Sequence, residues 1–129
     1  MSSDESAKLA TVRIILRLSG WAMVALIGIL SLVPGTLRPH TGLPNQWEHF
    51  GAYFVTASTL ALSSSRDLAA AQRVGLGLGI YAGLLEIAQL WVPGRSSSLI
   101  DFAAGFLGSV TGCLFTILIC SLWAGNRGN

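Results

Sequence analysis

The chain has 129 residues, of which 52% are hydrophobic and only 11% are charged, and its mean hydropathy is +0.63. Soluble domains carry about 25% charged residues, so this composition excludes an ordinary soluble protein and predicts one membrane domain over residues 1–129. The net charge of +2 comes from scattered basic residues. Without a run of Lys and Arg that could follow a phosphate backbone, nucleic acid is not expected as a partner.

The first predicted membrane helix covers about residues 14–33, after a flexible tail over 1–12. About 20 apolar residues are needed to cross a bilayer, and this segment meets that length. A cleaved signal peptide is the alternative. Asp4 and Glu5 lie where such a peptide carries positive charge, however, and the sequence SLVPG offers no cleavage site. A retained helix is therefore favoured.

Three further helices complete the predicted all-α, integral membrane four-helix bundle. The second covers about 47–64 and is the least apolar, because Ser58, Thr59 and Ser63 lower its hydropathy. The third covers about 74–92 and ends at Pro93-Gly94, and the fourth covers about 99–123, before a flexible tail over 125–129. Because the connections are short, neighbouring helices are expected to be antiparallel.

The basic residues predict the orientation of the chain. With four spans, both termini and the middle connection share one side of the membrane. Positively charged residues concentrate on the cytoplasmic side of membrane proteins, so both termini are expected in the cytoplasm. The inner side would hold Lys8, Arg13, Arg17, Arg66, Arg73 and Arg127, and the outer side Arg38 and Arg95.

Polar residues cluster at the predicted outer ends of the second, third and fourth helices. Leaving Glu86 unpaired within the membrane would cost about 2.5–3.5 kcal/mol, so a partner is expected. Arg95 is the expected one, since a planar guanidinium can bridge two carboxylates. The sequence predicts an outer-face binding cluster of Glu48, His49, Tyr53, Glu86, Gln89, Arg95, Ser98 and Asp101.

Glycines recur on the third and fourth helices at spacings of three or four residues, which places those of each helix on one face. Such faces let two membrane helices approach closely. We expect the two glycine faces to pack against each other: Gly75, Gly79 and Gly83 on the third helix, and Gly105, Gly108 and Gly112 on the fourth.

Several of these residues have structural alternatives. Ser98 and Asp101 fit the pattern of a helix-capping box, and Asn45 with Glu48 resembles the same device. Arg95 could contact lipid phosphates instead of a carboxylate. His49 and the acids at 86 and 101 offer a one-His, two-carboxylate set, but zinc sites usually recruit more His or Cys. We therefore expect no metal and no cofactor.

At these positions the chain resembles the VanZ-like family of small bacterial membrane proteins, named for a teicoplanin-resistance protein. The family's first motif is roughly D-K-x-x-H-F-x-x-Y at the start of the second helix. His49, Phe50 and Tyr53 match it, whereas Asn45 and Gln46 replace the Asp-Lys pair.

A second motif strengthens the resemblance, which covers about residues 15 to 115. The family pattern is roughly E-x-x-Q, then P-G-R-x-x-S, then D-x-x-x-N-x-x-G. Gly105 stands where Asn is usual. The resemblance implies a multi-pass protein of the bacterial cytoplasmic (inner) membrane and a link to glycopeptide resistance, without a particular reaction. The matching residues are Glu86, Gln89, Pro93, Gly94, Arg95, Ser98, Asp101 and Gly108.

Three functions are open at this point. In the first, the outer cluster binds a lipid headgroup, an envelope precursor or a glycopeptide, with Arg95 holding an anionic group. In the second, the protein is an enzyme that acts on a lipid-linked substrate, with His49 or Glu86 as the general base. In the third, it is a structural subunit of a larger membrane complex.

Overall fold

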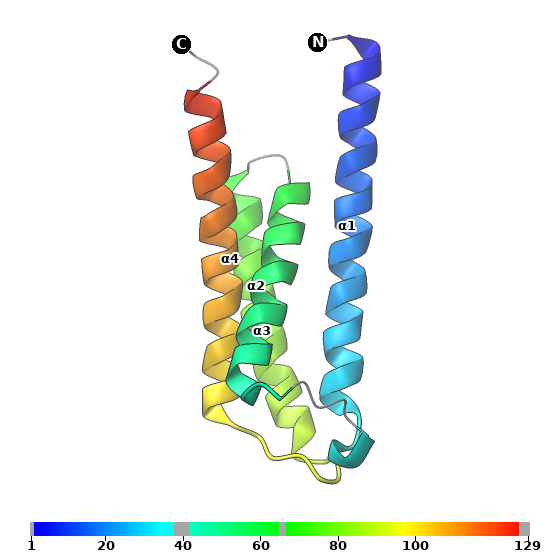
Figure 1. Cartoon of the computed structure of the whole chain (residues 1–129), viewed down its shortest axis with the longest axis vertical. Helices are drawn as coiled ribbons and strands as arrows, with labels where there is room; N and C mark the ends of the chain where they lie inside the picture. The colour runs from blue at the N-terminus through cyan, green and yellow to red at the C-terminus, as the bar shows by residue number, and fades with distance from the viewer. Residues whose placement is uncertain (1, 38–41, 65–66, 127–129) are drawn as a thin grey trace.

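The computed structural model describes residues 2–37, 42–64 and 67–126. The N-terminus of α1 and the C-terminus of α4 lie at one end of the molecule, and the α1–α2 and α3–α4 connections lie at the other (Figure 1). Neighbouring helices therefore run in opposite directions. The elements are α1 (Ser3–Leu32), the short 3-10 helix η1 (Gly35–Leu37), α2 (Asn45–Ser63), α3 (Leu68–Gln89) and α4 (Leu99–Gly125).

Helix α1 begins at Ser3, where the sequence predicted a flexible tail. Ser2 and Glu5 form a capping box: the Glu5 amide donates to Ser2 Oγ at 3.2 Å, and the Ser2 amide donates to the Glu5 carboxylate at 3.0 Å. Lys8 then pairs with Asp4 one turn away at 2.6 Å. These local interactions start a helix in polar sequence that hydropathy cannot detect. At 1.5 Å per residue α1 is about 45 Å long, more than the hydrocarbon core requires.

The other helix ends also differ from the hydropathy boundaries. Helix α3 begins at Leu68 rather than near residue 74, because the Asp67 side chain accepts a hydrogen bond from the Ala69 amide at 3.0 Å and caps the helix. Helix α4 continues to Gly125. A flexible tail was predicted over residues 125–129, of which 127–129 lie outside the described part of the chain. Hydropathy therefore located the apolar stretches and missed the capped polar turns.

Three of the described helices, α1, α3 and α4, are long and apolar enough to cross a membrane. Helix α2 has 19 residues but is not among them. Its hydroxyl groups bond to backbone carbonyls: Thr56 donates to Ala52 at 2.7 Å, and Ser58 donates across to Gly112 of α4 at 3.2 Å. These hydroxyl groups are thus satisfied by backbone carbonyls within the protein.

Among the described residues, most large apolar side chains are exposed, and most of the buried positions are small or polar. Trp21 is 59% exposed and Leu84 is also 59% exposed, whereas Ala57 and Ser109 are fully buried and Thr56 is 1% exposed. A soluble protein of this size would bury its large side chains in a core. The reverse arrangement suits a chain whose outer surface meets lipid and whose helices pack through small residues.

The glycines of α4 pack mainly against α2, not against the glycines of α3. A Cβ added at Gly108 would fall against the Phe50 carbonyl, and one at Gly112 would lie 2.5 Å from the Phe54 carbonyl. The expected glycine-to-glycine contact between α3 and α4 is therefore wrong. The two backbones that approach most closely here are those of α2 and α4, because both glycines lie against carbonyl groups rather than side chains.

The glycines of α3 instead receive side chains of α4. Gly79 lies under the ring of Phe106. A Cβ added at Gly83 would lie 3.4 Å from the ring of Phe102, and one added at Gly75 would lie 3.4 Å from Cys113 Sγ. Gly105 sits beneath the Tyr53 ring of α2, at 3.1 Å. Helix α4 thus presents glycines to α2 and aromatic rings to α3.

The Gly108 contact predicts a specific stability effect. Gly108→Ala should lower the free energy of unfolding by about 1–3 kcal/mol, because the new methyl group must push α2 away. Gly77→Ala is the control, since an added Cβ there meets nothing within 4 Å. Thermal unfolding of both variants in the same detergent checks the prediction. A Gly108→Ala protein as stable as Gly77→Ala would contradict the α2–α4 contact.

Candidate functional site

Three side chains from three different helices converge at the end of the molecule opposite the chain termini. His49 lies in the second turn of α2, Glu86 near the end of α3 and Asp101 in the first turn of α4. Each offers one ligand atom, and these atoms all lie within 4.8 Å of one another. Both carboxylates are 6% exposed, and the imidazole is half-buried. The predicted convergence of these three residues is confirmed.

Glu86 connects the end of α3 to the start of α4. Its Oε2 accepts a hydrogen bond from the Ser98 amide at 2.8 Å. Ser98 is the N-cap of α4, and its Oγ accepts from the Asp101 amide at 3.4 Å. The predicted role of Ser98 at the helix start is therefore confirmed, and the acid of α3 supplies a second contact at the same cap.

Asp101 connects α4 to α2 rather than closing a capping box. Its Oδ2 accepts a hydrogen bond from the Asn45 amide group at 2.9 Å. Asn45 was predicted only as a capping residue paired with Glu48, but Pro44 occupies the N-cap of α2, and no side chain of the described residues caps it. Asn45 is therefore a site residue that sequence reasoning missed. Its position in the first motif that resembles the VanZ-like family, where Asp is usual, could have indicated a role in the site.

Arg95 supports α1 and does not pair with Glu86. Its guanidinium donates to the Leu30 carbonyl and, at 3.1 Å, to the Val33 carbonyl. These groups end α1 and carry the negative end of its dipole, where a cation is favourable. The expected bridge from Arg95 to the carboxylates is thus wrong: the turn before α4 leads the guanidinium to α1 instead.

The turn that carries Arg95 is tightly fitted to the end of α1. Gly94 has a φ of +75°, a conformation that glycine adopts without strain. The Gly35 amide donates to the Pro93 carbonyl at 3.2 Å, and an added Cβ at Gly35 would meet the backbone of Gly94. The Pro93-Gly94-Arg95 sequence therefore serves to pack the α3–α4 connection against the end of α1.

Three further residues of the predicted cluster lie on α2 and α3, the helices that carry His49 and Glu86. Tyr53 is 1% exposed, and its ring lies nearly parallel to that of His49, with centroids 6.4 Å apart. Gln89 is 3% exposed, and its Nε2 has no hydrogen-bond partner within the described part of the chain. Glu48 is half-buried beside His49 in the sequence but is not one of the three converging groups.

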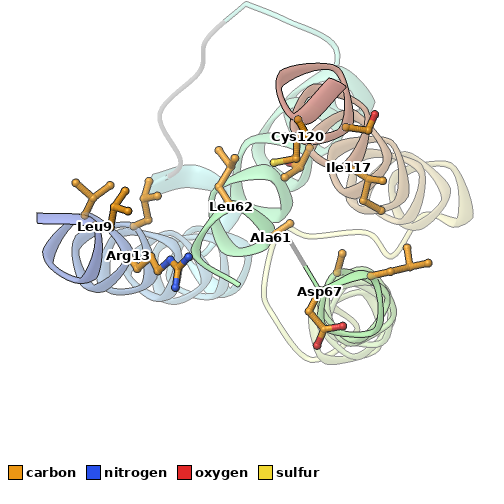
Figure 2. A pocket seen from close by; sticks show the side chains of 14 residues that line it. Leu9, Arg13, Ala61, Leu62, Asp67, Ile117 and Cys120 are labelled. Atoms are coloured by element: carbon orange, nitrogen blue, oxygen red, sulfur yellow. The ribbon is translucent and has the colours of Figure 1, made fainter. Parts of the chain in front are cut away.

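A separate groove of about 410 Å³ lies near the opposite end of the helices. Figure 2 shows side chains from all four α-helices around it. Leu9, Leu62 and Ile117 contribute apolar walls, while Arg13 and Asp67 are its charged members. Helix α1 has no buried residue before Gly20, so its N-terminal half stands away from the other helices. This groove is not part of the polar site.

The arrangement of His49, Glu86 and Asp101 combines a nitrogen ligand, half-buried, with two buried carboxylates. It can accept hydrogen bonds, hold a cation or bind a proton donor. Comparisons with protein-family models, curated proteins and solved structures found no match. The chemistry of the site therefore has to be argued from its residues.

The Arg95 contacts predict a structural effect of its removal. Arg95→Ala should lower the free energy of unfolding by about 1.5–3 kcal/mol, because two carbonyls at the end of α1 lose a charged donor. Arg73→Ala is the matched control, since that side chain is 76% exposed and its loss should cost no more than about 0.5 kcal/mol. Denaturant unfolding in detergent measures both. Equal stability of the two variants would contradict the docking role.

Proposed function

We propose that this protein is a VanZ-like integral membrane protein of the bacterial inner membrane, which binds the polar headgroup of a lipid or of an envelope precursor. The observation that carries the proposal is the convergence of His49, Glu86 and Asp101 at one end of three helices. Buried ionisable groups in membrane helices are costly and commonly serve binding or transport. Here both acids are 6% exposed and lie near the helix ends, where headgroups reside.

The proposed topology is a four-helix bundle with both termini in the cytoplasm. Helix α2 would be the fourth span: its 19 residues reach about 28 Å, and its hydroxyl groups are satisfied by backbone carbonyls. Of the predicted basic residues, Arg38, Arg66 and Arg127 lie outside the described part of the chain. Among the described ones, Arg95 alone lies at the polar-cluster end. The others lie in the N-terminal half of α1 or in the second turn of α3, and both of these helices begin at the end with the termini: Lys8, Arg13, Arg17 and Arg73.

The contacts of the site define the chemistry of its ligand. Glu86 and Asp101 are bonded to neutral donors, the Ser98 amide and the Asn45 side chain. The nearby guanidinium of Arg95 is bonded to α1. A ligand of this cluster therefore has to supply positive charge or hydrogen-bond donors. Amine-bearing headgroups and the amines and hydroxyls of glycan or peptide precursors have such groups.

The family resemblance supports a role in the cell envelope. It places His49, Glu86 and Asp101 in the matching motifs, and the structure independently brings the same three residues together. A headgroup site facing outward would encounter the lipid-linked precursors that glycopeptides bind. We therefore propose a contribution to teicoplanin-type resistance through this site.

The topology predicts opposite reporter activities at two positions. Alkaline phosphatase fused after residue 97, in the connection before α4, should be active, because this enzyme requires the oxidising space outside the inner membrane. The same enzyme fused after residue 126 should be inactive. Fluorescent-protein fusions at both points provide the complementary control. Active phosphatase at residue 126 with inactive phosphatase at residue 97 would overturn the orientation, and activity at both points would show that α4 does not cross.

The headgroup site predicts separable effects on binding and stability. Glu86→Gln keeps the volume of the side chain and should remove bound lipid or precursor while the protein remains folded. Asp67→Asn is the matched control, because Asn also caps α3 and residue 67 lies at the opposite end. Native mass spectrometry of the purified proteins measures bound ligand, and glycopeptide susceptibility of the host measures function.

The outcomes of this experiment distinguish a site from a structural subunit. Loss of ligand and resistance in folded Glu86→Gln supports binding. Retention of both would reject the headgroup site. A membrane protein that copurifies at fixed ratio with all variants, without bound lipid in any of them, would instead favour the subunit function.

A further inference from the structure

We infer that His49, Glu86 and Asp101 form a binding site for a divalent transition-metal ion of the zinc class. This inference goes beyond headgroup binding, because it concerns the ion alone and holds whether or not a lipid binds. The sequence disfavoured a metal because the cluster offers only one of the two histidines of the chain. The spatial arrangement now outweighs that argument, since three ligand side chains on three separate helices meet at one point.

The geometry requires little movement to enclose an ion. The three ligand atoms lie within 4.8 Å of one another. Zinc bonds to His nitrogen and carboxylate oxygen are about 2.0–2.2 Å long, so ligand atoms around one tetrahedral ion lie about 3.3–3.6 Å apart. Small side-chain rotations close this difference. One nitrogen and two oxygens leave a fourth position open, as in sites that bind a water or an exogenous ligand.

The charge balance of the site points to a cation. Glu86 and Asp101 are both 6% exposed, and their described hydrogen bonds come from neutral donors. Two carboxylates this close repel each other, and burial strengthens the repulsion because little water screens it. A divalent ion between them converts the repulsion into attraction.

The surrounding hydrogen bonds resemble the outer shell of a metal site. Such shells orient each ligand through its other polar atom. The Ser98 amide holds Glu86 Oε2 and the Asn45 side chain holds Asp101 Oδ2, so the second oxygen of each carboxylate can serve as ligand. These contacts connect the ends of α2, α3 and α4 and hold the donor set in place.

Gln89 supplies an independent indication of a missing ligand. Its side chain is 3% exposed, and its Nε2 has no hydrogen-bond partner in the described residues. It lies one turn after Glu86 on the same buried face of α3. A buried amide without a partner is rare and costs about 1–3 kcal/mol. A water or anion on the open position of the ion would satisfy it.

The test uses the full chain purified in detergent and stripped of metal. After addition of Zn²⁺ and dialysis against metal-free buffer, mass spectrometry of the metal should show one ion per wild-type chain. Asp67→Asn, a carboxylate change far from the site, should retain it. Glu86→Gln, Asp101→Asn and His49→Gln should each lose it. Asn45→Ala, which removes the hydrogen bond to Asp101, should weaken Zn²⁺ binding by about 10–100-fold.

Two additional measurements keep the result interpretable. Circular dichroism and thermal unfolding identify any variant that does not fold; His49→Gln, at a half-buried position, carries the test if an acid variant fails. Visible absorption of bound Co²⁺ should change when His49 is replaced, because a nitrogen ligand is lost. No retained Zn²⁺ in the wild type, or equal Zn²⁺ affinity in wild type and His49→Gln, overturns the inference. Neither result depends on lipid binding.

Discussion

The close approach of α2 and α4 is the constraint on which the described structure depends. It is possible because Gly108 and Gly112 present no side chain to the carbonyls of α2, and lipid supplies no hydrophobic force that would drive larger side chains together. This contact places the N-terminal ends of α2 and α4 beside each other. His49 and Asp101 meet there, and the Phe102 and Phe106 rings on the adjacent face of α4 hold α3 in position.

The polar groups then divide into two assemblies at the same end of the molecule. One consists of His49, Glu86 and Asp101 with neutral hydrogen-bond donors. The other joins Arg95 to the end of α1. Because the positive charge of Arg95 stabilises the end of α1, the negative charges of Glu86 and Asp101 still need a cation or hydrogen-bond donors from a ligand. Both the proposed headgroup site and the proposed ion site follow from that separation.

The residues of the two sequence motifs have distinct physical roles in this arrangement. Glu86 and Asp101 belong to the converging site, Ser98 caps α4, and Gly94 with Arg95 docks the connection onto α1. A motif read along the chain suggests one common function for its members. In the structure, only some of them face the site, and the others hold the helices that carry it.

The sequence alone determined that the chain is helical and suited to a membrane, because apolar stretches and glycine spacing are local properties. It also identified His49, Glu86 and Asp101, since ionisable groups in oily segments stand out. It did not determine that the glycines of α4 face α2, that Arg95 turns to α1 or that Asn45 holds Asp101. Those choices depend on how far each helix is rotated about its axis, and only packing among all four helices decides that rotation.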